Sequence, residues 1–307
     1  MDKQTIGLSE IQGSRVALGL MRLAGKTHEE AKLIIKTALD HGINFFDHAD
    51  IYGDGKSEEV FAKAMKALNI DRKSYVLQSK CGIIKSPSAF NFSKEHIISS
   101  VEGILKRLDT DYIDILLLHR PDILWDPKEI NEAFHILHDA GKVTYFGVSN
   151  MHQQQMSYLQ SVLDFPIVAN QLQFSITNAA LLTTGTLVNM LTEGQGASSI
   201  GILDYMREHN ITMQAWSPFQ YGFFEGVFLD HPKFPELNQK LEDIGKKYGV
   251  SKIAITVAWI NTHPAKIQTV VGTMTPKRII ECAQGGYITL TREEWYEIYH
   301  AAGYRLP

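Results

Sequence analysis

The chain has 307 residues, of which 44% are hydrophobic, and its 30 basic and 34 acidic side chains give a formal net charge of −4. This length and composition predict one large globular domain over residues 1–307, with enough apolar side chains for an extensive core. Because neither charge sign gathers into a run, and no apolar run could span a bilayer or form a signal peptide, we expect a cytoplasmic protein without nucleic-acid or membrane partners.

Eight short apolar or β-branched runs recur along the chain, each typical of a buried strand. Segments with helical periodicity separate them, so strand and helix alternate in chain order. The eight candidate strands are RVALGL near 15, INFFDHA near 43, SYVLQSK near 74, YIDILLLH near 112, TYFGVSN near 144, IVANQLQF near 167, ITMQAWSP near 211 and IQTVVGT near 267.

Helix-capping residues mark the starts of several intervening helices. Thr27 and Glu30 form a capping-box pattern, and Gly42 follows where that helix would end. Thr291 with Glu294 gives the same pattern for an extra helix near the C-terminus. Further helix starts are indicated by Asp126 before Pro127 and by Thr275 before Pro276.

Repeated strand–helix units imply parallel strands, and their closed arrangement is an α/β fold, the (β/α)8 TIM barrel. An open doubly wound sheet is the alternative, but it would normally carry a GxGxxG fingerprint after its first strand. LGLMRLAG holds Gly19 and Gly25 without that pattern, so the barrel is favoured. The opening segment QTIGLSEIQGSR, with Gly13 assigned to a turn, is expected to form a β-hairpin that closes the barrel floor.

Polar residues fall where the predicted strands end. The carboxyl ends of barrel strands meet at one mouth, which is where barrel enzymes place their active sites. We therefore expect these side chains to converge: Asp47 with Tyr52 just beyond it, Lys80, His119, Ser149, Asn150, Gln171, Trp216 and Ser217.

Each of these residues, taken alone, has a structural explanation. Asp47 could cap a loop, Tyr52 could pack in a turn, and His119 could be a hydrogen-bonded core histidine. Lys80 is harder to explain in this way, because a lysine at the end of a buried strand must reach solvent or be paired. Polar residues at several adjacent strand ends favour a functional site over independent accidents.

Asp, Tyr, Lys and His at one mouth suit the protonation of a carbonyl group. A phenol has a reference pKa of about 10 and is a poor acid at neutral pH unless a nearby ammonium stabilises its phenolate. Lys80 beside Tyr52 is expected to lower that pKa, with Asp47 holding the ammonium, while neutral His119 orients the carbonyl oxygen. Such a site needs a hydride donor, which side chains cannot supply and a nicotinamide cofactor can.

The same residues carry a resemblance to the aldo-keto reductases, NADPH-dependent carbonyl reductases built on a (β/α)8 barrel. INFFDHADIYG resembles the signature around that family's catalytic Asp and Tyr, and LQSKCG and LLLHRPD resemble the segments of its Lys and His. GKVTYFGVSN, ANQLQFS, AWSPF and VVGTMTPKRIIEC continue the series in the family's order. DHADIYG and LLLHRPD look most like the bacterial YdhF-like branch.

The resemblance implies a role for each matching position. Tyr52 would be the general acid, tuned by Lys80 and Asp47, and His119 would position the carbonyl. The cofactor would be NADPH, or NADP+ in the reverse direction, with Arg278 at its 2′-phosphate. The other cofactor-binding residues implied are Met21, Ser149, Asn150, Gln171, Trp216, Ser217, Phe219, Gly272, Thr273, Glu281 and Cys282.

Several positions differ from the family's common pattern. His48 stands where Thr is usual, Gly272 where some members have Lys, and Cys282 where Asn is usual. Loss of the lysine and the amide predicts a weaker grip on the cofactor, and His48 is interpreted as a packed imidazole. Because GYRLP follows the last predicted helix, the substrate pocket is expected to be formed by other loops, with Met21, Trp125, Phe219, Tyr221 and the FFEGVF segment.

Two alternative functions stay open. One is an NADPH-binding redox sensor with little turnover. The other is a metal-dependent barrel hydrolase. This function would leave Lys80 and Tyr52 unexplained, and the spacing of the cysteines and histidines does not indicate a metal site. We expect a monomer that acts on a small-molecule carbonyl substrate whose identity the motifs do not determine. The hydrolase would take its metal ligands from His48, Asp50, His119 and Asp122.

Overall fold

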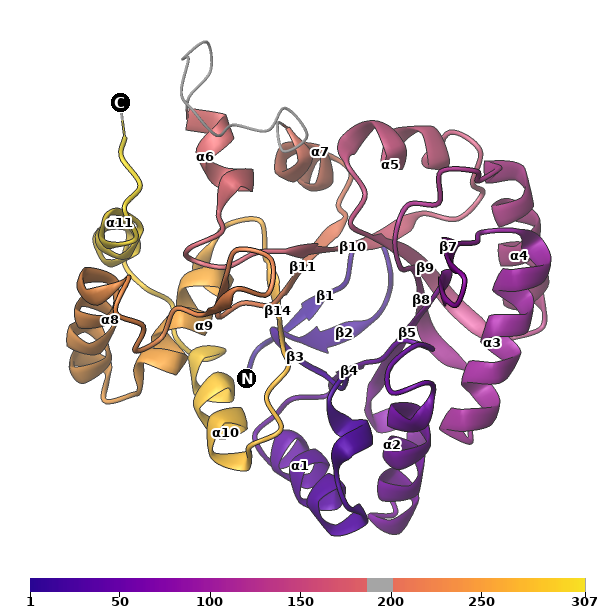
Figure 1. The fold of residues 1–307 in the computed structure, drawn as a ribbon, viewed down its shortest axis with the longest axis horizontal. Helices are drawn as coiled ribbons and strands as arrows, with labels where there is room; N and C mark the ends of the chain where they lie inside the picture. Colours follow the sequence, from indigo (N-terminus) through magenta and orange to yellow (C-terminus); the bar gives the residue numbers. More distant parts are fainter. Residues whose placement is uncertain (187–200, 307) are drawn as a thin grey trace.

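The computed structural model describes residues 1–186 and 201–306. In this part of the chain, eight parallel strands close into a barrel in the order β10-β11-β14-β3-β4-β5-β8-β9 (Figure 1). The predicted (β/α)8 barrel is confirmed, and each predicted strand matches one barrel strand. These strands are β3 (Val16–Gly19), β4 (Phe45–Asp47), β5 (Val76–Cys81), β8 (Ile113–Leu118), β9 (Val143–Ser149), β10 (Ile167–Gln173), β11 (Thr212–Trp216) and β14 (Gln268–Val271).

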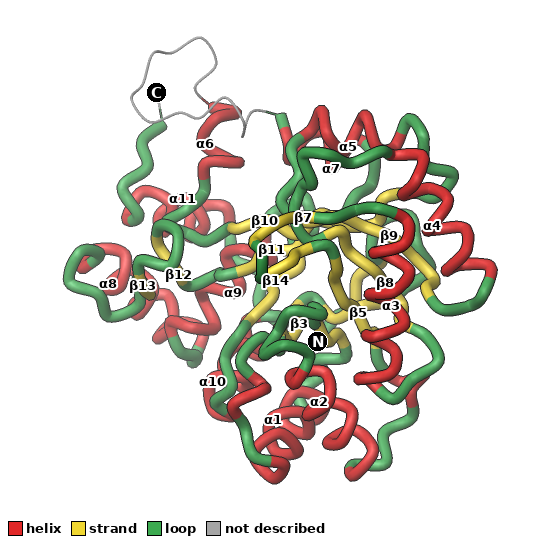
Figure 2. The backbone as a smooth tube through the Cα atoms, turned by 45° about the vertical axis from the view of Figure 1, so that its right-hand side comes forward, coloured by secondary structure: helices red, strands yellow, loops and turns green. Residues whose placement is uncertain are grey.

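Helices surround the barrel and bury their apolar sides against it (Figure 2). The capping boxes at Thr27 and Thr291 are present as predicted, each with its glutamate three residues later. No helix in the described residues is long and apolar enough to cross a membrane. The helices described are α1 (His28–Asp40), α2 (Lys56–Ala67), α3 (Lys94–Leu108), α4 (Pro127–Asp139), α5 (Gln153–Gln160), α6 (Ala180–Thr186), α7 (Ile202–Glu208), α8 (Pro235–Tyr248), α9 (Lys252–Thr262), α10 (Pro276–Gly285) and α11 (Arg292–Ala301), with short 3-10 turns η1 (Leu23–Gly25) and η2 (Arg72–Ser74).

An N-terminal hairpin of β1 (Lys3–Thr5) and β2 (Gln12–Ser14) closes the floor of the barrel, as predicted. Between its strands, Ile6 is fully buried in the apolar cluster inside the barrel. Gly13 is not at the turn but within β2; the positive φ of +54° belongs to Gly7. A Cβ on Gly7 would lie 2.2 Å from the carbonyl oxygen of Val168, so the close approach of hairpin and barrel requires glycine there.

Two smaller hairpins extend from the carboxyl end of the barrel. One consists of β6 (Ile83–Lys85) and β7 (Ser88–Phe90), directly after β5. The other consists of β12 (Gln220–Tyr221) and β13 (Gly226–Val227), in the long segment after β11 that was predicted to form a lid or pocket wall. Both hairpins therefore lie on the side of the barrel where the strands end.

Candidate active site

Three neighbouring strands bring predicted catalytic side chains to the carboxyl end of the barrel. Asp47 is the last residue of β4, Lys80 lies near the end of β5, and His119 directly follows β8. Lys80 is in register with Leu117, and the amide of His119 donates to the carbonyl oxygen of Cys81 at 2.9 Å. Because these strands are adjacent and parallel, the three side chains lie together at one mouth.

Lys80 is the centre of this cluster. Its Nζ lies 2.7 Å from both carboxylate oxygens of Asp47, 2.8 Å from the carbonyl oxygen of His48 and 3.3 Å from Tyr52 Oη. Burial is the largest single influence and lowers the pKa of Lys80, but the charges and hydrogen bonds of Asp47 and Tyr52 together outweigh burial, and the net pKa lies above its usual value. The side chain is fully buried, so the protein holds a charged ammonium out of water.

Tyr52 reaches the mouth from the loop between β4 and α2. Its backbone N–H donates to the carbonyl oxygen of Ala49 at 3.0 Å, and the next residue, Gly53, has a φ of +58°. A Cβ on Gly53 would lie only 2.4 Å from the Cβ of Ala24. The glycine after Tyr52 is therefore what allows this tight turn, and the turn fixes where the phenol emerges.

The pKa of Tyr52 is raised, which corrects the expectation that Lys80 would make this phenol more acidic. Burial raises the pKa first; Lys80 opposes burial, and the charge of Asp47 raises the pKa again. Burial prevails because the Asp47 carboxylate, 2.7 Å from the ammonium, cancels much of the positive field that Tyr52 experiences. Tyr52 consequently keeps its proton at neutral pH.

His119 completes the cluster as a neutral imidazole. Its ring centroid lies 6.1 Å from that of Tyr52, with the rings edge to face. Burial lowers the pKa of His119 well below its usual value, and the positive charges of Lys80 and Arg120 lower it further. Its Nδ1 is buried without a hydrogen-bond partner among the described residues. A neutral ring can donate one hydrogen bond, so His119 can orient an oxygen atom without adding charge.

Buried glutamines support Asp47 from inside the barrel. Gln78 Nε2 donates to Asp47 Oδ1 at 2.6 Å, and Gln171 Nε2 donates to the same oxygen at 3.1 Å. Gln78 is fully buried and Gln171 is 3% exposed. Together with Lys80, these amides replace the water molecules that an exposed carboxylate would bind, and they fix its orientation.

The glutamine network continues to the barrel floor. Gln78 and Gln214 exchange amide hydrogen bonds of 2.9 and 3.0 Å, Gln214 donates to Gln268 at 2.9 Å, and Gln268 donates to the carbonyl oxygen of Ser14 at 2.7 Å. The sequence reasoning missed Gln78, Gln214 and Gln268. A signal was present, because Gln78 stands two positions before Lys80, and residues two apart on a strand face the same side.

Residues at the ends of β9 and β11 form a second hydrogen-bonded group. Asn150 Nδ2 donates to Ser149 Oγ at 2.7 Å, and Trp216 Nε1 donates to Asn150 Oδ1 at 3.2 Å. Asn150 and Ser217 have φ values of +59° and +53°, a conformation uncommon outside glycine and frequent at functional sites. Gln171 turns its amide nitrogen into the barrel core, so its oxygen is the atom left for a ligand.

The segment between β14 and α10 carries the predicted phosphate contacts. Gly272 and Arg278 are exposed, Thr273 and Glu281 are half-buried, and a Cβ on Gly272 would meet nothing within 4 Å. This open segment, a guanidinium and the N-terminus of α10 fit a phosphate-bearing ligand. Cys282 is a correction: it lies on the inner face of α10 and is 1% exposed in the core, so it cannot contact a ligand at the surface.

Two residues of the metal-site alternative, His48 and Asp122, have structural contacts instead. His48 is fully buried with its ring centroid 4.8 Å from that of Phe61, as the packing interpretation predicted, and burial followed by the charge of Lys80 lowers its pKa to about 3. The carboxylate of Asp122 accepts hydrogen bonds of 2.8 Å from the backbone N–H of Phe92 and of Leu124. Among the described residues, no group of three or more His, Cys, Asp or Glu is placed to hold a metal.

The sequence model for the Aldo/keto reductase family matches residues 15–302. The chain belongs to this family. Among its relatives, the oxidoreductase YcsN of Bacillus subtilis is 38% identical over 99% of this chain and 100% of its own. A 6-dehydroglucose reductase of Agrobacterium fabrum is 34% identical, over 97% and 98%. The oxidoreductase YdhF of Escherichia coli is 32% identical, over 96% and 95%. The resemblance to the YdhF-like branch is thereby confirmed.

A solved structure supports the fold of this aldo-keto reductase. The aldo-keto reductase from Klebsiella pneumoniae in complex with NADPH matches it with a TM-score of 0.77 at 22% identity. The match covers 97% of this chain and 94% of that one. The barrel is therefore shared over nearly the whole length of both proteins.

The loops of this aldo-keto reductase place only some of the predicted pocket residues at the mouth. Met21 is 46% exposed, and Phe224 of the FFEGVF segment stacks on Trp216 with ring centroids 6.0 Å apart. Phe219 is half-buried and packs against the core. Tyr221 hydrogen-bonds His231 at 3.2 Å and packs on its ring, so it stabilises the β12–β13 hairpin rather than offering a free face.

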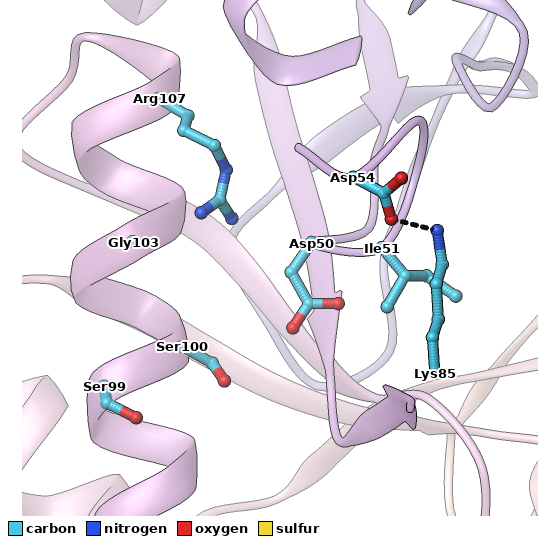
Figure 3. Close-up of a pocket in the computed structure, with 8 residues that line it drawn as sticks. All are labelled: Asp50, Ile51, Asp54, Lys85, Ser99, Ser100, Gly103 and Arg107. Carbon is cyan, nitrogen blue, oxygen red and sulfur yellow. Dashed lines mark hydrogen bonds and ion pairs between the residues drawn. The ribbon is translucent and has the colours of Figure 1, made fainter. Parts of the chain in front are cut away.

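A second pocket of this aldo-keto reductase, of about 330 Å3, lies beside the Tyr52 loop on the side of α3 (Figure 3). Asp50 contributes its carboxylate to this pocket, and its Oδ1 is buried without a hydrogen-bond partner among the described residues. Burial, then the charge of Glu58, raises the pKa of Asp50 to about 7, with Arg107 opposing. The pocket is lined by Asp50, Ile51, Asp54, Lys85, Ser99, Ser100, Gly103 and Arg107.

Proposed function

We propose that this protein reduces aldehydes or ketones to alcohols with NADPH as the hydride donor and Tyr52 as the general acid. The observation that carries this proposal is the position of Lys80 Nζ, which contacts the Asp47 carboxylate at 2.7 Å and Tyr52 Oη at 3.3 Å. A protonated phenol, a charged ammonium and a neutral imidazole at one mouth are the groups that carbonyl protonation requires.

Proton transfer follows from the charges in the cluster. Tyr52 holds a proton at neutral pH, and it would donate that proton to the carbonyl oxygen as negative charge develops there. The ammonium of Lys80, already oriented by Asp47, would stabilise the phenolate that remains. His119 would hold the carbonyl oxygen by a hydrogen bond, and because it is neutral it does not compete for the proton.

Hydride transfer requires a bound nicotinamide, and NADPH would supply the hydride to the carbonyl carbon. The NADPH-bound Klebsiella relative supports this choice. Ser149, Asn150 and the oxygen of Gln171 would hold the carboxamide, and Trp216 would pack on the ring. Ser217 and the segment from Gly272 would approach the phosphates. The adenosine end would be held by Thr273, Arg278 and Glu281, whereas Cys282 is buried in the core and takes no part.

The choice of NADPH over NADH is predicted to depend on Arg278. Because its exposed guanidinium would bind the 2′-phosphate, Arg278→Ala should weaken NADPH binding by roughly 10- to 100-fold, the value of one charge-assisted contact. NADH binding should change far less, since NADH has no such phosphate. Titration of both cofactors by tryptophan fluorescence measures the two dissociation constants. Lys277→Ala removes the neighbouring charge as a control, and equal losses of NADPH and NADH in Arg278→Ala would contradict the assignment.

Carbonyl-dependent oxidation of NADPH tests the proposed function. The purified protein is incubated with NADPH and a panel of aldehydes, ketones and quinones, and the NADPH absorbance is followed over single and multiple turnovers. We expect turnover with at least one aldehyde or ketone. Tight NADPH binding without oxidation by any compound of the panel would instead favour a redox sensor.

A further inference from the structure

Arg120 is a cation at the active-site mouth that the proposed chemistry does not use. It follows His119 directly after β8, and its guanidinium carbon lies 5.7 Å from the ring centroid of Trp216, at the end of β11. β9 and β10 separate these two strands in the barrel. The side chain of Arg120 therefore reaches across part of the mouth, toward the ring on which the nicotinamide is expected to pack.

The backbone on both sides of Arg120 is fixed. The amide of His119 is bound to Cys81 O at 2.9 Å. Two residues after Arg120, the buried Asp122 accepts hydrogen bonds of 2.8 Å from the backbone N–H of Phe92 and of Leu124. Arg120 is thus presented from a constrained loop, which is what a ligand-binding side chain requires.

The guanidinium of Arg120 has no compensating anion in the part of the chain that the structure describes. The residue is half-buried, and the described contact of its guanidinium is the cation–π contact with Trp216 rather than a hydrogen bond or an ion pair. Burial lowers the pKa of Arg120, and no carboxylate among the described residues opposes this effect. A partly buried guanidinium that has no anionic partner in the described residues, next to the residue that would hold the carbonyl oxygen, fits an anionic ligand.

The phosphates of the cofactor are not suited to be that anion. Their expected contacts are Ser217, just after β11, and the segment between β14 and α10. That segment lies across the barrel from β8, with three strands between the two positions in either direction around the ring (Figure 1). Arg120 instead directly follows His119, the residue that would hold the carbonyl oxygen of the substrate. The anion that Arg120 meets should therefore belong to the substrate.

We infer that Arg120 binds a carboxylate on the carbonyl substrate, so that the preferred substrates are aldehydes or ketones that carry an acid group. This inference rests on the proposed carbonyl reduction. A planar guanidinium matches a planar carboxylate through two parallel hydrogen bonds, which a lysine cannot reproduce. Arg120 would thus determine specificity, while the Asp47–Lys80–Tyr52 cluster carries out the proton transfer.

A matched pair of substrates tests the inference. The parent protein and Arg120→Met are assayed with NADPH on 4-oxobutanoate and on its methyl ester, which differ in the negative charge. We expect the parent to favour the acid by about 10- to 100-fold in kcat/KM, the value of a charge-assisted pair. Arg120→Met should remove this preference, and Arg120→Lys should retain only part of it. A phosphate-bearing aldehyde, assayed in parallel, shows whether the site takes carboxylates or any oxyanion.

Controls separate the possible failures. Arg22→Met removes an exposed guanidinium from the loop after β3, at the same end of the barrel, and should keep the parent ratio of acid to ester. Equal rates for acid and ester in the parent, or equal losses of both in Arg120→Met, would overturn the role of Arg120 while leaving carbonyl reduction intact. A parent that reduces neither these compounds nor any other carbonyl would overturn the proposed function itself.

Discussion

Tyr52→Phe is expected to lower kcat for carbonyl reduction by roughly 10²- to 10⁴-fold, the range that general acid catalysis contributes. The substitution removes only the hydroxyl whose oxygen lies 3.3 Å from Lys80 Nζ. The ring can keep its position, in which its centroid lies 5.1 Å from the same nitrogen. NADPH binding should stay near the parent value because the lost group acts on the substrate. Steady-state kinetics with the best aldehyde of the panel, together with a cofactor titration, measures both quantities.

Tyr75→Phe is a suitable control for this prediction. Tyr75 is a largely buried tyrosine outside the mouth, packed on Phe46 and Phe61, and its hydroxyl takes no part in the cluster around Lys80. Its loss should leave kcat near the parent value, because this hydroxyl contacts none of the groups that transfer the proton. If Tyr52→Phe reduced aldehydes as fast as Tyr75→Phe, another proton donor would have to be sought.

Asp47→Asn is expected to destabilise the protein by about 3–5 kcal/mol, because it leaves the ammonium of Lys80 buried without its counter-charge. Lys80→Met should cost less, since Asp47 keeps the amide donors of Gln78 and Gln171 at 2.6 and 3.1 Å. The double variant Asp47→Asn/Lys80→Met removes both charges of this pair and should recover most of the stability that Asp47→Asn loses. Urea unfolding of the parent and the three variants, followed by far-UV circular dichroism, measures the order of their free energies of unfolding.

Activity should not follow stability in this series. All three variants lack either the ammonium that stabilises the Tyr52 phenolate or the carboxylate that orients it, so each should lose at least about 100-fold in kcat. A double variant that regained activity along with stability would show that the ion pair serves the fold alone. A double variant less stable than Asp47→Asn would contradict the assignment of the loss to an unpaired buried charge.

The architecture could be predicted from the chain because it depends on local and periodic features. Apolar runs alternate with amphipathic segments, and capping residues such as Thr27 and Thr291 mark helix starts that the structure contains. Eight parallel strands in one sheet bring their carboxyl ends to one mouth whatever the details of packing. The convergence of Asp47, Lys80 and His119 follows from that topology, because each stands where a strand ends.

The direction of the Tyr52 pKa shift could not be predicted in this way. It depends on how completely the phenol is buried and on how far the Asp47 carboxylate offsets the Lys80 charge. Both depend on how segments distant in the sequence pack together. The withdrawal of Cys282 into the core likewise depends on which face of α10 meets the barrel. The resemblance to the family predicted that Cys282 contacts the cofactor, whereas the structure buries its side chain in the core.

The sequence by itself thus determined the strand order, the barrel and the chemical types present at its mouth, because periodicity and strand-end positions are local properties of the chain. Only the tertiary structure decided how those groups are charged and paired: the glutamines beneath Asp47, the buried imidazole of His48 and the contact of Arg120 with Trp216. The physical reason is that solvation and Coulomb interactions depend on the full three-dimensional surroundings of a group, which strands distant in sequence supply.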